Sequence, residues 1–185
     1  MPFDAHRPYM LCCCLSRQAA RRIALSCGPL ESPSKFVDQF GGLVVDIRNE
    51  VVIRKPRQEV FDRLSDPRSE LEWNPKVELM EAVDGELVVG ARFRAKWKLS
   101  KPLTLTITRL DRPNGWSYTN DGPIIVDLDA DLEDHAQGTL LRTSFKPRAR
   151  GAARLMFPVF LLMIRREEKD NMRYLKGWLE GTHRL

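Results

Sequence analysis

Apolar and polar residues alternate through the middle of this chain, and the alternation stops near Gly151. Between Ala91 and Leu99, apolar Ala, Phe, Trp and Leu residues alternate strictly with Arg and Lys. A period of two is typical of an antiparallel strand that has one face against a core and the other in water. From Ala152 to Leu179 the apolar residues recur at helical spacing instead. One long helix is therefore available to cover the apolar face of a sheet.

The same alternation predicts further strands on both sides of residues 91–99. They cover residues 45–53, 76–83, 103–108, a segment that begins at Trp116, 124–133 and 141–145. Two short helices are expected between the first two strands. Arg57–Leu64 has its apolar residues on one face, and the second helix starts at Asp66-Pro67, an N-cap followed by a proline at the first helical position. Pro75 ends this second helix, and Pro158 is expected to kink or restart the long one.

The predicted order is one strand, two short helices, six strands and one long helix. This order predicts an α+β fold in which a seven-stranded curved antiparallel sheet wraps around the long C-terminal helix. We expect one domain over residues 44–181. Curvature of such a sheet around a single helix leaves space between them, and that space is the candidate ligand site.

Residues 1–40 differ in composition from the rest and contain all four cysteines. The apolar run Met10–Leu15 is too short to span a bilayer and lacks the features of a signal peptide. We expect a disordered extension, or a start codon placed too far upstream. An Arg-rich transit segment and lipidation at Cys12–Cys14 are the alternatives. A predicted domain without cysteines cannot rest on disulfides, which favours a reducing, cytoplasmic compartment.

Several short motifs in this order resemble the START-like, or SRPBCC, superfamily, and within it the polyketide cyclase/dehydrase and lipid-transport group. They are Lys55-Pro56, Glu59-Val60-Phe61, Asp66-Pro67, Trp73-Asn74-Pro75, Gly90, Gly138-Thr139 and a long C-terminal helix that closes with Leu175 to Glu180. The resemblance covers residues 44–181. It implies a helix-grip fold with a hydrophobic cavity that holds a lipid, sterol, polyketide, quinone or similar molecule. It implies cyclase or dehydratase activity only for a minority of members, and a fold alone does not decide function.

The inner faces of the predicted strands give the candidate ligand-binding residues. They are Phe93, Ala95, Trp97, Leu105, Ile107, Trp116, Tyr118, Asn120, Val126, Leu128, Leu141, Thr143 and Phe145, with Phe160 from the long helix. Plain core packing is the alternative for each of them. Tyr118, Asn120 and Thr143 are the polar residues that could orient a ligand. Trp73 and Asn74 form either a lid at the cavity mouth or, as we favour, a packing contact and a turn.

No catalytic constellation, phosphate-binding loop or metal-ligand spacing is recognisable, and we expect no cofactor and no metal. Asp127, Asp129 and Asp131 alternate on the outer face and are expected to be solvated. The net charge of +5 is spread along the chain, which argues against nucleic-acid binding. The expected function is therefore binding or carriage of a hydrophobic small molecule, with a cyclase or dehydratase as the alternative.

The apolar segment Leu155–Ile164 has two interpretations. It is either buried on both sides, or an exposed patch beside a portal. Arginines flank it, namely Arg148, Arg150, Arg154, Arg165 and Arg166. In the second case a transient contact with an anionic membrane surface is expected during ligand exchange. The oligomeric state does not follow from the sequence.

Overall fold

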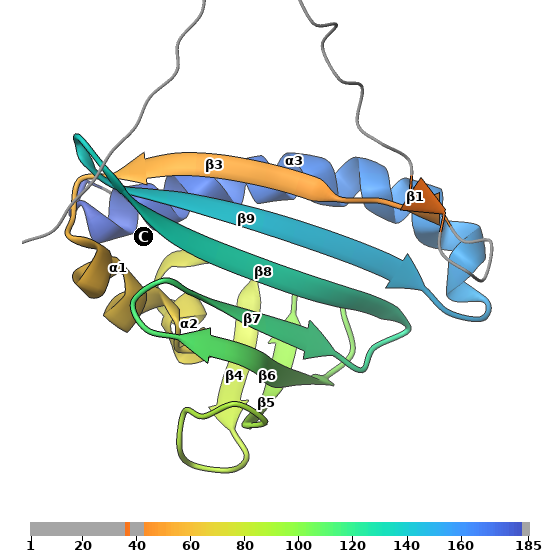
Figure 1. The fold of residues 1–185 in the computed structure, drawn as a ribbon. Coiled ribbons are helices and arrows are strands. Elements are labelled where there is room, and N and C mark those ends of the chain that lie inside the picture. Colours follow the sequence, from red (N-terminus) through yellow and green to blue (C-terminus); the bar gives the residue numbers. More distant parts are fainter. Residues whose placement is uncertain (1–35, 38–42, 183–185) are drawn as a thin grey trace, which may run out of the picture. The chain divides into compact units, whose positions relative to one another are not determined.

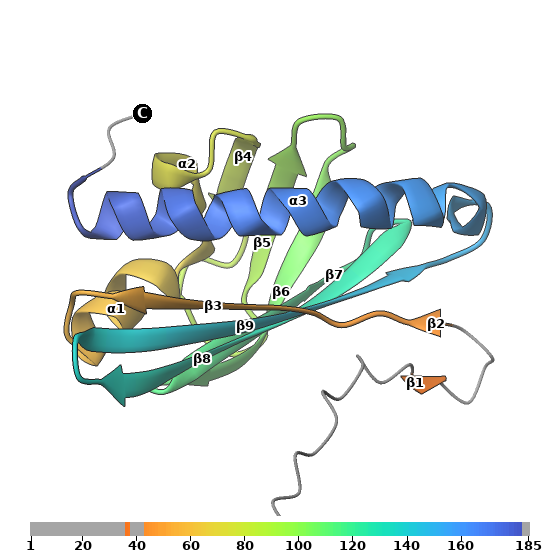
Figure 2. The same cartoon turned by 90° about the horizontal axis from the view of Figure 1, so that it is seen from above.

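The computed structural model describes residues 36–37 and 43–182 of the chain. The predictions made above for residues 1–35 and 38–42, including the cysteine cluster, lie outside these described residues. Two short strands, β1 (Phe36–Val37) and β2 (Leu43–Val44), pair with each other and were not predicted. The rest is a seven-stranded antiparallel sheet with helices on its concave side (Figures 1 and 2).

The strands of the large sheet follow the predicted segments closely. They are β3 (Ile47–Ile53), β4 (Val77–Ala82), β5 (Arg92–Trp97), β6 (Leu103–Asp111), β7 (Gly115–Asn120), β8 (Ile124–His135) and β9 (Gly138–Ala149). Their spatial order is β3-β9-β8-β7-β6-β5-β4, so successive strands from β4 to β9 are neighbours. The exception is β3, which pairs with β9 although the two strands lie far apart in sequence; Asn49, for instance, is opposite Thr143. The predicted helix-grip fold is confirmed.

The two short helical segments between β3 and β4 form for the local reasons that the sequence suggested. Helix α1 (Arg57–Leu64) buries Val60, Phe61 and Leu64 on one face. The Asp66 side chain accepts a hydrogen bond from the Arg68 backbone N–H at 2.9 Å and caps the 3-10 turn η1 (Pro67–Ser69). One turn of α-helix, α2 (Glu70–Trp73), follows it. These short elements carry Glu70 and Trp73 to the interior.

Helix α3 (Ala153–Leu179) runs alongside β3 and packs against β3, β9 and α2 (Figure 2). It continues through Pro158 as one helix, so no second helix starts there. No helix among the described residues is long and apolar enough to cross a membrane. The side of α3 that faces the sheet contains Ile164, Glu168, Leu175 and Leu179.

The apolar core is divided into three clusters. The first joins α1, Trp73 and the C-terminal half of α3 to the sheet around Leu141. The second lies on the inner face of β4–β6 around Phe93 and contains no α3 residue. The third joins β3, β8 and β9 to Leu161 and Ile164 of α3. Tyr118 and Leu110 touch both the first and the second cluster, so they lie at the boundary between them.

Candidate functional site

The predicted ligand-binding residues fall into a sealed group and a half-open group. Phe93, Ala95, Leu105, Ile107 and Leu141 are almost completely buried, and Trp116, Val126, Thr143 and Phe145 are buried. By contrast Trp97, Tyr118, Asn120, Leu128 and Phe160 keep part of their surface exposed. Trp97, Tyr118 and Leu128 lie on the inner face of the sheet, because they alternate with outward residues on their strands. Their partial exposure means that solvent reaches the inner face near these side chains.

A carboxyl group meets Tyr118 at this half-open place. The Tyr118 hydroxyl donates a hydrogen bond to Glu70 Oε1 at 3.2 Å. The side chains of Trp97 and Asn74 also hydrogen-bond to the Glu70 carboxyl. Strands β5 and β7 thus supply an indole and a phenol, while α2 supplies the acceptor between them.

A second carboxyl group lies on the buried stripe of α3. Glu168 is only 6% exposed, although it sits between Ile164 and Leu175 where an apolar side chain would be expected. Its Oε1 accepts a hydrogen bond from Asn171 Nδ2 at 3.2 Å, one turn further along the helix. The charge of Glu70 helps to raise the pKa of Glu168, and the charges of both carboxyls help to raise the pKa of Tyr118. We call Glu70, Tyr118, Glu168 and Asn171 the interior polar cluster.

Both carboxyls of this cluster have pKa values raised toward neutral pH. Burial raises the pKa of Glu70 to about 7, and the hydrogen bonds from Tyr118, Trp97 and Asn74 only partly oppose this shift. Burial and repulsion from Glu70 raise the pKa of Glu168 to about 7 as well. Burial and the two nearby carboxylates raise the pKa of Tyr118, so its hydroxyl stays protonated and acts as a donor. At neutral pH the cluster can therefore both donate and accept a proton.

Several buried polar atoms on the elements that carry this cluster, and on β9, lack hydrogen-bond partners among the described residues. They are Ser69 Oγ, Trp73 Nε1, Thr143 Oγ1 and Asn171 Oδ1. Thr143 is 6% exposed, points to the inner face of β9, and its Oγ1 is unpaired. Trp73 is 7% exposed, lies three residues after Glu70 on α2, and its Nε1 is unpaired. An unpaired buried polar atom is costly, and such atoms often meet a ligand or an ordered water. Burial of Trp73 in the first core cluster favours the packing interpretation over a lid.

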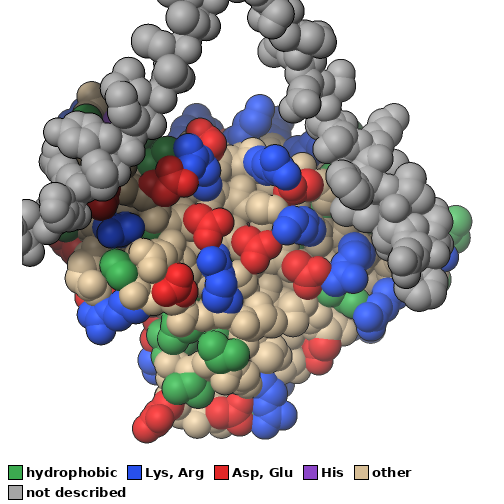
Figure 3. All heavy atoms as spheres, viewed as in Figure 1, with side chains coloured by type: hydrophobic (Ala, Val, Ile, Leu, Met, Phe, Trp, Pro, Cys, Tyr) green, Lys and Arg blue, Asp and Glu red, His purple; other side chains and the backbone are tan. Residues whose placement is uncertain are grey.

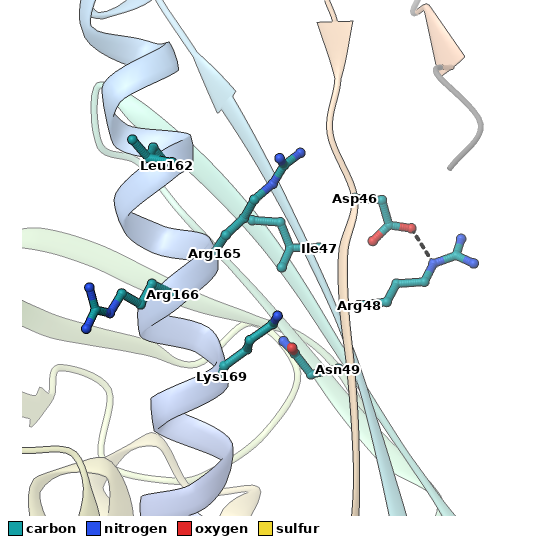
Figure 4. Close-up of a pocket in the computed structure, with 8 residues that line it drawn as sticks. All are labelled: Asp46, Ile47, Arg48, Asn49, Leu162, Arg165, Arg166 and Lys169. Carbon is teal, nitrogen blue, oxygen red and sulfur yellow. Dashed lines mark hydrogen bonds and ion pairs between the residues drawn. The ribbon is translucent and has the colours of Figure 1, made fainter. Parts of the chain in front are cut away.

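Two open clefts lie elsewhere, between β3 and α3. The larger has a volume of about 400 Å³ and is lined by Asp46, Ile47, Arg48, Asn49, Leu162, Arg165, Arg166 and Lys169 (Figure 4). The smaller, of about 250 Å³, is lined by Asn49, Glu50, Val51, Lys169, Met172, Arg173 and Lys176. None of the predicted ligand-binding residues lines either cleft.

The outer face of the sheet is covered by ion pairs. Asp127 pairs with Arg148, Asp129 with Lys146, and Asp131 with Arg109, as expected for a solvated face. Figure 3 shows acidic and basic side chains interspersed over β8 and β9. Among the described residues, no three His, Cys, Asp or Glu side chains are grouped as a metal site would need.

Sequence reasoning missed both carboxyl groups of the interior cluster. Glu168 had a usable signal, because it interrupts an apolar stripe that runs through Ile164 and Leu175 at helical spacing. Glu70 had none, since α2 is a single turn and shows no periodicity. Tyr118 and Thr143 were predicted as polar residues of the inner face, and both lie there.

Comparison of the structure with solved structures identifies the architecture. A crystal structure of Ara h 8.0201 superposes with a TM-score of 0.58 at 17% sequence identity, covering 74% of this chain and 97% of that one. TTHA0849 from Thermus thermophilus gives a TM-score of 0.61 at 15% identity, covering 73% and 97% of the two chains. The chain has the START-like fold.

A third similar structure belongs to a protein of a biosynthetic pathway. The di-domain ARO/CYC BexL from the BE-7585A biosynthetic pathway gives a TM-score of 0.59 at 13% identity; the match covers 75% of this chain and 50% of BexL. No family model matches the sequence, and no curated protein is similar to it. Identities this low show the fold and leave the activity to the site itself.

Proposed function

We propose that this START-like chain binds a small, mainly hydrophobic molecule between its sheet and α3, with the polar end of the molecule at the Glu70–Tyr118–Glu168 cluster. The observation that carries the proposal is this polar cluster on otherwise apolar inner surfaces, next to half-open Trp97 and Leu128. Ligand sites typically combine apolar walls with a few convergent polar groups. A lipid, polyketide or quinone that bears a hydroxyl or carbonyl fits this description.

The cluster suggests how such a ligand is oriented. Glu168 and the unpaired Thr143 Oγ1 can accept hydrogen bonds, and the unpaired Trp73 Nε1 can donate one. A ligand that satisfies these atoms removes the cost of leaving them unpaired, whereas a pure hydrocarbon does not. We therefore expect selectivity for amphipathic molecules over hydrocarbons.

Native mass spectrometry and thermal shift with oleic acid, a sterol, a quinone, a flavonoid and hexadecane test the proposal. We expect one bound molecule and a raised Tm for at least one of the four oxygenated ligands, and weaker binding by Tyr118→Phe and Glu168→Gln. Glu81→Gln, on the exposed outer face of β4, is the matched control and should bind like the unmodified chain. Absence of binding for all five compounds would contradict the proposal.

A second candidate function is catalysis of cyclisation or dehydration on a polyketide-like substrate. The hydrogen bond from Tyr118 to Glu70 favours this second function, because it gives a polar residue of the inner face an ionisable partner. The carboxylate of either Glu70 or Glu168 can remove the proton next to a ketone. The other carboxyl, when protonated, can then give its proton to a departing hydroxyl, which leaves as water. Two carboxyls with pKa values near 7 suit both steps at neutral pH.

The two candidate functions differ in what happens to a bound substrate. Incubation with a linear aromatic poly-β-ketone and analysis by liquid chromatography and mass spectrometry distinguishes them. A catalyst gives a product lighter by one water at a rate that falls by about a hundredfold or more in Glu168→Gln, as expected for loss of a general acid or base. A carrier protects the compound without converting it.

We also propose that the protein works in the cytoplasm and touches a membrane surface transiently when the ligand is exchanged. Apolar side chains of α3 support the contact, since Leu155 is 84% and Leu162 is 79% exposed. Exposed apolar groups in a contiguous region are typical of interaction sites. Vesicle sedimentation of the full chain tests the contact.

A further inference from the structure

Two cations of α3 face β3 across the larger cleft. Arg165 and Lys169 are four residues apart on the helix and reach toward β3, where Ile47 and Asn49 line the cleft (Figure 4). Asn49 adds a third donor, because its Nδ2 has no hydrogen-bond partner among the described residues. Three donor groups, two of them charged, therefore surround this part of the cleft.

The acidic side chain at the cleft does not neutralise these cations. Asp46 is paired with Arg48 at 2.7 Å, and Figure 4 shows both pointing away from the helix. Arg165, Arg166 and Lys169 form no ion pair with any described residue. Cations without a protein partner, set beside an unpaired amide donor, favour an anion as the occupant of the cleft.

An exposed apolar surface continues from the cleft toward the start of α3. It consists of Leu155, Met156, Val159, Leu162 and Met163, and Leu162 also lines the cleft. These residues recur at helical spacing along α3. Arg154 lies before this surface and Arg166 follows it one turn after Leu162, and both are exposed. An apolar helix face bordered by cations is typical of helices that lie in the interface of anionic membranes.

We infer that the N-terminal half of α3 docks on a membrane of anionic phospholipid, with a lipid phosphate in the cleft between Arg165, Lys169 and Asn49. The apolar side chains from Leu155 to Met163 enter the boundary between headgroups and acyl chains. The inference rests on the proposed membrane contact and adds the lipid class and the binding site. A cleft of about 400 Å³ is large enough for a phosphodiester group.

Sedimentation of the full chain with phosphatidylcholine vesicles, with and without phosphatidylglycerol, tests the inference. We expect binding to the mixed vesicles to be at least tenfold tighter than to phosphatidylcholine alone. The double variant Arg165→Gln/Lys169→Gln should bind the mixed vesicles about 25-fold more weakly, since each cation near an anionic surface changes binding by about fivefold. Leu155→Gln/Leu162→Gln should bind both kinds of vesicle more weakly.

The matched control is Arg54→Gln/Arg94→Gln, which removes the same net charge from exposed positions on β5 and just after β3. Equal losses in the control and the cleft variant would overturn the anion site. Equal binding to the two kinds of vesicle would do the same but leave the proposed membrane contact intact. Absence of binding to both would reject the contact as well. Self-association without vesicle binding, seen by analytical ultracentrifugation, would assign the apolar surface to a second copy of the chain.

Discussion

Glu168 shows what a single residue can reveal about an interior site. The side chain is buried on the sheet-facing stripe of α3 and accepts a hydrogen bond from Asn171. Burial disfavours its charged form and raises its pKa from 4.5 to about 7. The folded protein therefore holds a proton on this carboxyl at pH values where the unfolded chain has lost it. The stability that this proton contributes is complete below pH 4.5 and is lost as the pH rises through 7.

Replacement of Glu168 by Gln should remove the contribution of this residue to the pH dependence of stability. A pKa difference of this size corresponds to about 3 kcal/mol. We expect Glu168→Gln to be about 3 kcal/mol more stable than the unmodified chain at pH 8 and nearly equal to it at pH 4. Urea denaturation at both pH values measures the difference. The control is Glu81→Gln, which replaces an exposed carboxyl on β4 and should have the stability of the unmodified chain at both pH values. A Glu168→Gln chain that is less stable than the unmodified chain at pH 8 would contradict the raised pKa of Glu168.

Tyr118 provides a second prediction at the same scale. Its hydroxyl donates to Glu70 at 3.2 Å and stabilises the charged form of that carboxyl. Tyr118→Phe should cost about 1 kcal/mol of stability, because Glu70 loses one buried hydrogen bond. The pKa of Glu70 should also rise, which NMR titration of the side-chain carboxyl carbons can follow. An unchanged Glu70 titration would show that the two groups do not interact in solution.

Single residues also mark the limit of what the sequence predicts about the site. Alternation along a strand assigns a side chain to a face, which is why Tyr118, Thr143 and the outward Asp127 were placed correctly. It does not reveal which residue from another element meets that side chain. Glu70 comes to Tyr118 from 48 positions earlier in the chain, and no local pattern contains that information.

The turn of the β8–β9 hairpin packs closely against the end of β3, the edge strand of the sheet. Gly138 has a φ of 134°, and a Cβ there would overlap the carbonyl oxygen of Ile53 at the end of β3. The next residue, Thr139, donates from Oγ1 to the Lys55 carbonyl at 2.7 Å. The backbone of the hairpin therefore approaches β3 too closely for any side chain at position 138.

Gly138→Ala should destabilise the protein by about 2–4 kcal/mol, since either the hairpin or the end of β3 must move. Gly85→Ala is the control, because Gly85 has a φ of 86° but nothing within 4 Å of its added Cβ. The control should lose about 1–2 kcal/mol from backbone strain alone. Thermal unfolding of both variants gives the comparison, and equal losses would show that the contact with Ile53 is unimportant.

Helix α3 contains a proline, Pro158, in its interior, where a proline disfavours the helix. Pro158 lies in the second turn and is exposed, and it has no N–H for the Arg154 carbonyl. Pro158→Ala should therefore stabilise the protein by about 1–3 kcal/mol. Met156→Ala, an exposed position two residues earlier, should change stability by less than about 0.5 kcal/mol. Guanidinium denaturation measures both, and a destabilised Pro158→Ala chain would show that the proline packs against another element.

Elements were easier to predict than their partners. The period of two and the turn residues gave every strand of the large sheet, because those signals are local. The pairing of β3 with β9 was not predicted, since it joins segments that lie far apart in sequence. The strands β1 and β2 have two residues each, too few for any periodicity.

At the scale of the whole molecule, the division of the core explains where polar groups can lie inside. The cluster around Phe93 is complete without α3, while the cluster around Leu141 includes Leu175 and Leu179 of that helix. Tyr118 is at their boundary, and it carries the hydrogen bond to Glu70. Two separately packed clusters can tolerate polar side chains between them, which a single continuous core would exclude.

All the clusters lie within the unit Lys35–Leu185. Among the described residues, the first buried apolar side chain is Val45. A chain that starts at Lys35 should therefore keep its fold, with a free energy of unfolding within about 0.5 kcal/mol of the full chain. It also lacks all four cysteines, so reductant should not affect it. Urea denaturation measures the midpoint and slope for both chains. A lower midpoint at equal slope would mean that residues before Lys35 stabilise the domain.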